Sequence, residues 1–120
     1  MKQNKIVDAY KTIKNMNGEK FHLPVAYKLY KLRKELEPHF DFKTEQEKAA
    51  IAEFEGKVND NGSVSFKSPE IAQQFVDKLK ELGDMEIETE IEPVVIRMED
   101  VHVELTPNEI EKLDGFIDFE

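Results

Sequence analysis

A stripe of apolar residues in the second quarter of the chain constrains the fold more than any other feature. Its members recur at intervals of three or four residues, as residues on one face of an α-helix do. Leu23-Pro24 stands just before them and predicts the start of that helix, because proline is favoured in the first helical turn. The stripe consists of Val25, Leu29, Leu32 and Leu36, and Phe40, Ile51 and Phe54 continue it.

Pro38 leaves two interpretations of this segment open. Proline lacks an amide donor and crowds the preceding turn, so it ends or kinks a helix. Thr44 and Glu47 have the spacing of a capping box, which would start a second helix. The apolar stripe, however, runs past both features. We therefore favour one long, kinked helix to about Glu55 over two separate helices.

Three further helices are predicted where apolar residues at helical spacing lie between capping residues. Thr106 and Glu109 form the pattern of a capping box, and a glycine near the end of each helical pattern predicts its stop. The three predicted segments run from Lys5–Met16 to a stop at Asn17-Gly18, from Ser68-Pro69 to Gly83, and from Thr106-Pro107 to Gly115.

Alternating residues predict a small antiparallel sheet. Asn61-Gly62 between Val58 and Val64 indicates a β-hairpin, because both turn residues tolerate a positive φ. The segment Met85–Leu105 alternates as well, with a break at Pro93. We expect an α+β fold, mostly helical, in which Val58–Phe66 and Met85–Leu105 build one sheet.

The length of 120 residues fits a single domain, residues 1–120, with one modest core. A long helix with a sustained apolar stripe often needs a second copy to cover it, so a homodimer is a candidate assembly. The predicted core comprises Ile13, Val25, Leu29, Leu32, Leu36, Phe40, Ile51, Phe54, Ile71, Phe75, Leu79, Leu82, Ile87, Ile91 and Leu105.

Charge is divided unevenly along the chain. The net charge is −9, yet residues 1–34 hold nine Lys/Arg against two acids, and residues 35–120 hold eight against twenty-four. The chain has no cysteine, no apolar run long enough to span a membrane and no apolar centre of a signal peptide. We expect a soluble protein of a reducing cytoplasm, with no membrane partner.

Four glutamates form the most unusual local pattern. Glu86, Glu88, Glu90 and Glu92 alternate with Met85, Ile87, Thr89 and Ile91, which places four carboxylates on one side of an extended segment; we call them the acidic row. They could be the solvated face of a half-buried sheet, or charges that keep an edge strand from pairing. They could also imitate the phosphates of a DNA strand.

A basic patch lies on the predicted long helix. Its residues, together with Tyr27 and Tyr30, could contact a nucleic-acid backbone. A solvated helix face is the simpler interpretation, and the net charge of −9 argues against nucleic acid as a partner. The patch consists of Lys28, Lys31, Arg33 and Lys34.

Catalytic and metal-binding motifs give no positive signal. His22, His39 and His102 are too far apart in sequence for a helical metal-binding pattern, and the chain has no GxSxG, P-loop or GxGxxG motif. We therefore expect neither an enzyme nor a cofactor.

Four segments carry a family resemblance: FHLPVAYKLYKLRKELEP, DNGSV, EIEPVVI and VELTPNEIEKLDGFI. In this order they resemble a family of small proteins of tailed bacteriophages and prophages, over nearly the whole chain. Pro38-His39 in the middle of the long helix departs from the family pattern. The resemblance implies a phage-encoded protein made in the cytoplasm of a bacterial host, and it assigns no site residues.

Two hypotheses of function follow. The first is a non-enzymatic phage accessory or assembly protein that acts by protein-protein binding. The alternative is an acidic inhibitor that mimics DNA and binds a host DNA-binding protein or nuclease through the acidic row.

Overall fold

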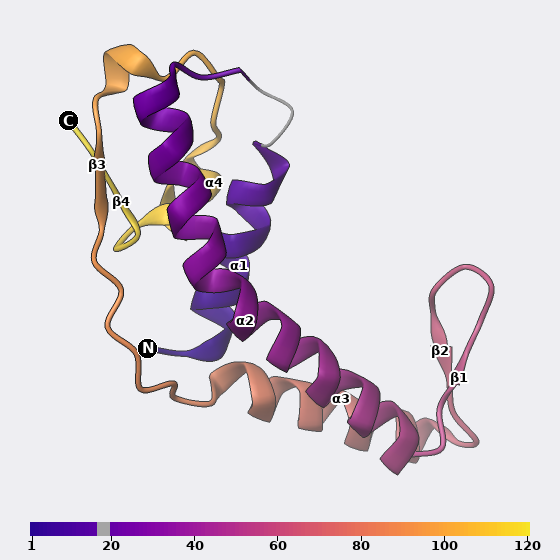
Figure 1. Cartoon of the computed structure of the whole chain (residues 1–120). Helices are drawn as coiled ribbons and strands as arrows, with labels where there is room; N and C mark the ends of the chain where they lie inside the picture. Colours follow the sequence, from indigo (N-terminus) through magenta and orange to yellow (C-terminus); the bar gives the residue numbers. More distant parts are fainter. Residues whose placement is uncertain (17–19) are drawn as a thin grey trace.

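The long helix is continuous through Pro38. A computed structural model describes residues 1–16 and 20–120 (Figure 1). Helix α2 spans Leu23–Glu53, 31 residues with Pro38 inside. In Figure 1 its axis changes direction near the middle, where proline removes one backbone hydrogen bond. The single long helix is therefore confirmed.

The capping box expected at Thr44 and Glu47 is not one. The Thr44 hydroxyl donates to the carbonyl of Phe40 at 3.0 Å, and Glu47 lies 3.7 Å from the Lys43 ammonium. Both are bonds of a helix interior. Thr44 and Glu47 have the spacing of a capping box, but they lie inside a helix that begins at Leu23.

A body and an arm share α2. The body combines α1 (Gln3–Asn15), the first half of α2 and α4 (Pro107–Leu113), and the arm combines the second half of α2 with α3 (Pro69–Asp84) and a hairpin (Figure 1). The molecule measures 52 × 32 × 23 Å, and its radius of gyration is 17.0 Å. A compact domain of this length would have about 14 Å. The chain is therefore elongated.

The starts of the short helices follow their caps. Ser68 accepts from the amide of Ile71, and Thr106 and Glu109 form the predicted capping box. Helix α1 begins two residues earlier than expected, at Gln3. The stop predicted at Asn17-Gly18 lies outside the described residues.

In the part of the chain that the structure describes, two small sheets are present instead of the single sheet that the alternation predicts. Strands β1 (Lys57–Val58) and β2 (Val64–Ser65) form an antiparallel hairpin at the tip of the arm. Strands β3 (Val94–Ile96) and β4 (Ile117–Phe119) pair in parallel in the body. The fold class, α+β and mostly helical with a small antiparallel sheet, is confirmed.

The expected pairing of Val58–Phe66 with Met85–Leu105 is wrong, because α3 carries the chain back from the hairpin to the body. The closing segment pairs instead with β3: the amide of Val94 donates to Phe116 O at 3.0 Å, and that of Glu120 donates to Ile96 O at 2.9 Å. Residues 101–105, which also alternate, form no strand after the 3₁₀ helix η1 (Met98–Asp100).

The hairpin turn uses one positive φ rather than two. Gly62 has a φ of +85°, and its amide donates to the carbonyl of Asn59 at 3.0 Å. Asn59 in turn donates to the carbonyl of Ser63 at 2.8 Å. The loop therefore has three residues and ends in a left-handed glycine, one of the common hairpin connections.

The main core lies in the body. The inner face of α2, Ile13 and Leu82 are buried there or beside it as predicted, whereas Phe40, Ile87, Ile91 and Leu105 are half-buried around it. Sequence patterns missed the contribution of the chain ends. The buried residues outside the predicted core include Ile6, Val7, Tyr10, Ile96, Leu113, Phe116 and Ile117.

A second, smaller apolar cluster holds the arm together. The ring of Phe75 lies 4.8 Å from that of Phe66 and 6.4 Å from that of Phe54, measured between centroids. Ile51, Ile71 and Leu79 are only half-buried. The arm therefore has a thinner core than the body.

A close approach of α1 joins the two parts. A Cβ built on Gly83, inside α3, would overlap the side chain of Asn4. Beside it, the fully buried Gln3 donates from Nε2 to Leu82 O and to Gln46 Oε1, both at 2.9 Å. Gly83 was predicted to close α3, but the helix continues to Asp84, and the glycine serves this approach.

Candidate functional surfaces

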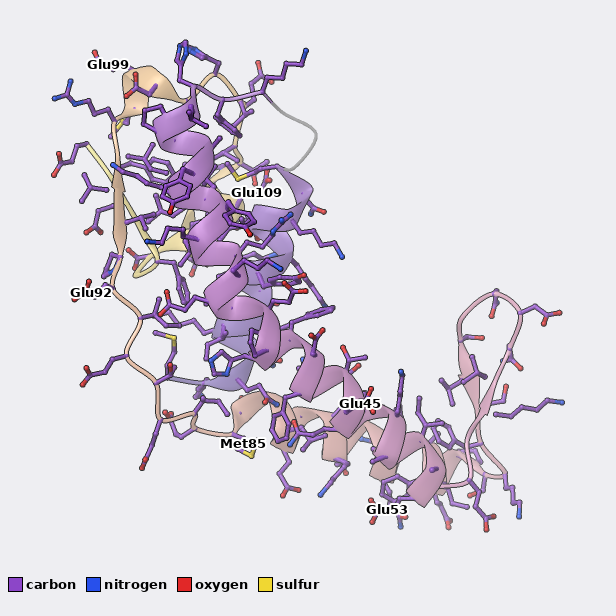
Figure 2. All side chains as sticks on the ribbon, in the orientation of Figure 1. Glu45, Glu53, Met85, Glu92, Glu99 and Glu109 are labelled. Atoms are coloured by element: carbon purple, nitrogen blue, oxygen red, sulfur yellow. The ribbon has the colours of Figure 1, made fainter. Side chains whose placement is uncertain are left out.

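The acidic row is fully on the surface. Residues 85–93 form an extended segment in which Glu86, Glu88, Glu90 and Glu92 are exposed, while Ile87 and its apolar neighbours are half-buried. Figure 2 shows Glu92 pointing away from the body. The alternation of sides is thus as predicted.

Within residues 1–16 and 20–120, the segment nevertheless pairs with no strand, and its backbone forms an isolated bridge between Lys2 and Glu86. The explanation that the carboxylates protect an edge strand therefore does not apply. At the exposed edge of β3, Lys28 forms a hydrogen bond instead: its ammonium donates to Val95 O at 2.7 Å.

Glu86 differs from the rest of the row. The amino group of Met1 donates to its carboxylate at 2.7 Å and lowers the pKa of Glu86 below its ordinary value, first through this hydrogen bond and then through its charge. Among the residues that the structure describes, Glu88, Glu90 and Glu92 take part in no salt bridge. Three carboxylates of the row are thus open to a partner.

The predicted basic patch is not a single patch. At 100° per residue, Lys31 and Lys34 lie on the outer side of α2, whereas Lys28 and Arg33 flank the buried stripe on opposite sides. Lys28 is bonded to Val95 O, and Lys34 pairs with Glu37 at 3.7 Å. The structure therefore does not bring the four cations together.

A second stripe follows the outer side of α2, and we call it the outer stripe. Leu23, Tyr27 and Tyr30 are 80%, 56% and 48% exposed. Two cations lie over its rings: Lys31 at 5.5 Å from the Tyr27 centroid and Arg33 at 5.9 Å from that of Tyr30. The stripe consists of Leu23, Tyr27, Tyr30 and Lys34, at i, i+4, i+7 and i+11.

An apolar groove opens in the part of the body formed by the last 23 residues. It has a volume of about 290 Å³, and its rim includes Met98 and Ile110, which are 63% and 47% exposed. Val101, Val103 and Leu105 face it from the extended segment after η1. The groove is lined by Met98, Val101, Val103, Leu105, Ile110 and Phe119.

Carboxylates flank several lining residues in sequence, and on an extended segment such neighbours point to the opposite side. Glu104 lies between two lining residues, and Asp118 and Glu120 flank Phe119; all three are exposed. From Met98 to Glu120 only Lys112 is basic. The acids of this segment are Glu99, Asp100, Glu104, Glu109, Glu111, Asp114, Asp118 and Glu120.

Sequence reasoning missed the groove. The alternation of Val101, Val103 and Leu105 predicts a strand, but these residues pair with no strand among the residues that the structure describes. The contribution of Ile110 could have been suspected, because it is apolar and stands between two glutamates of α4.

Two histidines come closer than expected. His22 and His102 lie with their ring centroids 6.3 Å apart, although 80 positions separate them in sequence. Within residues 1–16 and 20–120 no group of three or more histidines or acids is arranged to hold a metal ion. In the same ranges no helix is both long enough and apolar enough to cross a membrane.

Comparison of the chain with protein-family models, with curated proteins and with solved structures found no match.

Proposed function

We propose that this chain is a non-enzymatic accessory or assembly protein of a phage or prophage and that it acts by binding another protein. The observation that carries the proposal is the apolar groove with its exposed rim residues Met98 and Ile110. Contiguous exposed apolar surface rimmed by polar groups is typical of interaction sites. The phage setting is supported by the resemblance of the sequence pattern alone.

The lining of the groove supports an apolar protein segment as its occupant, because its lining residues are all apolar. Amphipathic helices present such apolar faces and bind grooves through anchors at i, i+4 and i+7.

Affinity capture from phage-infected bacteria tests the proposal. The tagged wild-type chain is compared with Ile110→Glu, which places a charge in the groove, and with Val58→Glu as a control. Val58 is 59% exposed and lies on the hairpin, at the tip of the arm. We expect a retained protein that Ile110→Glu loses and Val58→Glu keeps. Equal retention by all three chains would contradict the groove as the binding site.

A second candidate function is inhibition of a DNA-binding protein by DNA mimicry. It is favoured by the exposure of the acidic row on an extended segment, because same-side residues there repeat at about 6.6–6.8 Å, close to successive phosphates of one DNA strand. Glu86 is occupied by Met1, so Glu88, Glu90 and Glu92 would carry the binding.

Charge removal tests this second candidate without disturbing the contact of Glu86. The triple variant Glu88→Gln/Glu90→Gln/Glu92→Gln is compared with Glu35→Gln/Glu53→Gln/Glu81→Gln, which removes three exposed carboxylates elsewhere. Mimicry predicts that a host DNA-binding protein is retained by the wild type and the control, is lost by the first variant, and is released by added salt. Retention independent of the three row residues would refute it.

A further inference from the structure

We propose that two copies of the chain pair through the outer side of α2, with the two helices antiparallel and related by a two-fold axis near Pro38. The apolar stripe that made a homodimer a candidate is buried within its own chain, so it cannot form such a contact. The observation that carries the proposal is the order of charges along the exposed side of the same helix. The groove takes no part in this contact, so the inference is independent of the proposed function.

The outer side of α2 is basic in its first half. Residues 20–34 contain no acid, and Lys31 and Lys34 are exposed on this side. The exposed rings of Tyr27 and Tyr30 lie beside them on the same side of the helix. The first half therefore presents two ammonium groups and two aromatic rings to solvent.

The same side becomes acidic in the second half of α2. At 100° per residue, Asp41 and Glu45 lie within about 20° of Lys34 around the helix axis, and both are exposed. Glu37 is half-buried at the boundary between the two halves. The second half therefore presents carboxylates on the side where the first half presents ammonium groups.

An antiparallel pair matches the two halves, because the basic half of each copy then lies on the acidic half of the other. With the two-fold axis just before Pro38, Lys34 of one copy faces Asp41 of the other, and the hydroxyl of Tyr30 can donate to Glu45. The symmetry repeats both contacts, as in any isologous interface. A parallel pair would place like charges opposite each other, which is unfavourable.

Ion pairs within one chain do not prevent this contact. Lys34 lies 3.7 Å from Glu37, and Lys48 lies 3.5 Å from Glu45. All four side chains are more than a third exposed, and exposed ion pairs contribute little stability because water screens them. Lys34 is therefore able to exchange its partner for a carboxylate of a second copy.

The outer side of α2 is accessible to a second copy. Figure 1 shows α2 passing in front of α1 and α3, so its opposite side is open in the part of the chain that the structure describes. Pro38 lies on this side, about 40° from Lys34 around the axis. Its ring crowds the carbonyl of Lys34, so the helix opens there and is convex outward. The two copies should therefore approach most closely at Pro38, where the two-fold axis lies.

Charge-reversal variants test the pairing, with mass measured by light scattering and sedimentation over a concentration series. We expect the wild type to reach twice the monomer mass of 14.0 kDa. Lys31→Glu/Lys34→Glu and Asp41→Lys/Glu45→Lys should each stay monomeric, because each brings like charges together. An equimolar mixture of the two variants should form a heterodimer, because the two reversed halves match each other and so do the two native halves.

Two controls separate this contact from other effects of charge. Lys57→Glu/Lys80→Glu changes the net charge by the same amount as the first variant, but it reverses exposed cations of the arm. Ile110→Glu changes the groove. Both controls should dimerise as the wild type does.

Spin labels measure the direction of the pairing. The chain has no cysteine, so Phe42→Cys and Ala52→Cys each introduce one labelling site, and both positions are exposed. In the antiparallel dimer the two labels at position 42 should lie about 14 Å apart along the helix axes, and those at position 52 about 40 Å apart. Equal distances at both positions would indicate a parallel pair and overturn the inference.

Three results of the mass measurement would also overturn the inference: a wild type that is monomeric at every concentration, reversal variants that still dimerise, or a mixture that stays monomeric. If the pairing fails while Ile110→Glu still abolishes capture of another protein, the proposed function stands and only this inference falls. If the pairing succeeds while capture is independent of Ile110, the reverse holds.

Discussion

Gly83 shows how a single residue sets the distance between two helices. We predict that Gly83→Ala lowers the free energy of unfolding by about 1–3 kcal/mol, because the new methyl group would overlap the side chain of Asn4. Chemical denaturation measures the change. In the double variant with Asn4→Ala most of the loss should disappear, since the overlapping atoms are gone. A stabilised Gly83→Ala would mean that helix propensity outweighs the contact.

The stability that Glu109 contributes at the start of α4 should depend on pH. A hydrogen bond from the backbone amide of Thr106 holds the pKa of Glu109 below its ordinary value of 4.5. A carboxyl group with a lowered folded-state pKa contributes stability above its unfolded pKa, and this is lost as the pH falls through the folded value. As the pH falls from neutral to below 4.5, the wild type should therefore lose more stability than Glu109→Gln. Parallel losses in thermal unfolding would contradict this.

At the residue scale, the sequence predicts contacts between groups that lie close together in the chain. Thr106 and Glu109 cap α4 because the two groups they satisfy lie within four residues. The same spacing at Thr44 and Glu47 predicts a capping box that does not form. Capping needs free amides, and the amides inside a continuous helix are already hydrogen-bonded. The approach of Asn4 to Gly83 could not be foreseen, since it joins residues 79 positions apart.

At the scale of an element, Pro38 should lower the stability of helix α2. Replacing it by alanine restores an amide that can donate to the carbonyl of Lys34. We predict that Pro38→Ala raises the free energy of unfolding by roughly 1–3 kcal/mol, and that Pro38→Gly gains about 1 kcal/mol less. Denaturant titration with helix content by circular dichroism measures both. A destabilised Pro38→Ala would show that the bend is needed for the packing of α3.

Elements were predictable where pairing is local. The hairpin follows from Asn61-Gly62, because its strands are neighbours in sequence. The parallel pair of β3 and β4 was missed, because more than 20 residues separate Val94 from Ile117 and the register depends on the route between them. The acidic row had the right alternation but no partner strand, and alternation alone cannot supply one.

At the scale of the whole molecule, the arm should be less stable than the body. Phe75→Ala removes the ring shared by the arm cluster, and we predict that it speeds hydrogen exchange in the hairpin and α3 while amides of α1 remain protected. Leu36→Ala, at a fully buried position of the body, should lower protection throughout, at a cost of about 2–5 kcal/mol. Identical exchange patterns in the two variants would show one cooperative unit instead.

The division of charge along the sequence has a spatial counterpart. The basic helix α1 and the first half of α2 lie in the body, and so does the acidic segment 98–120. The two regions are therefore not separated by the arm. The sequence could not indicate that each of these regions leaves one apolar surface exposed. That depends on which side of α2 faces the core and on where residues 101–105 pass.

The hairpin at the end of the arm has a practical consequence. Its three-residue loop is exposed and stands far from the body in Figure 1. Exposed loop tips accept insertions more readily than other sites. An epitope or a fluorescent protein placed between Asp60 and Asn61 would therefore make the chain visible in a living cell, with the groove, the outer stripe and the acidic row left unaltered.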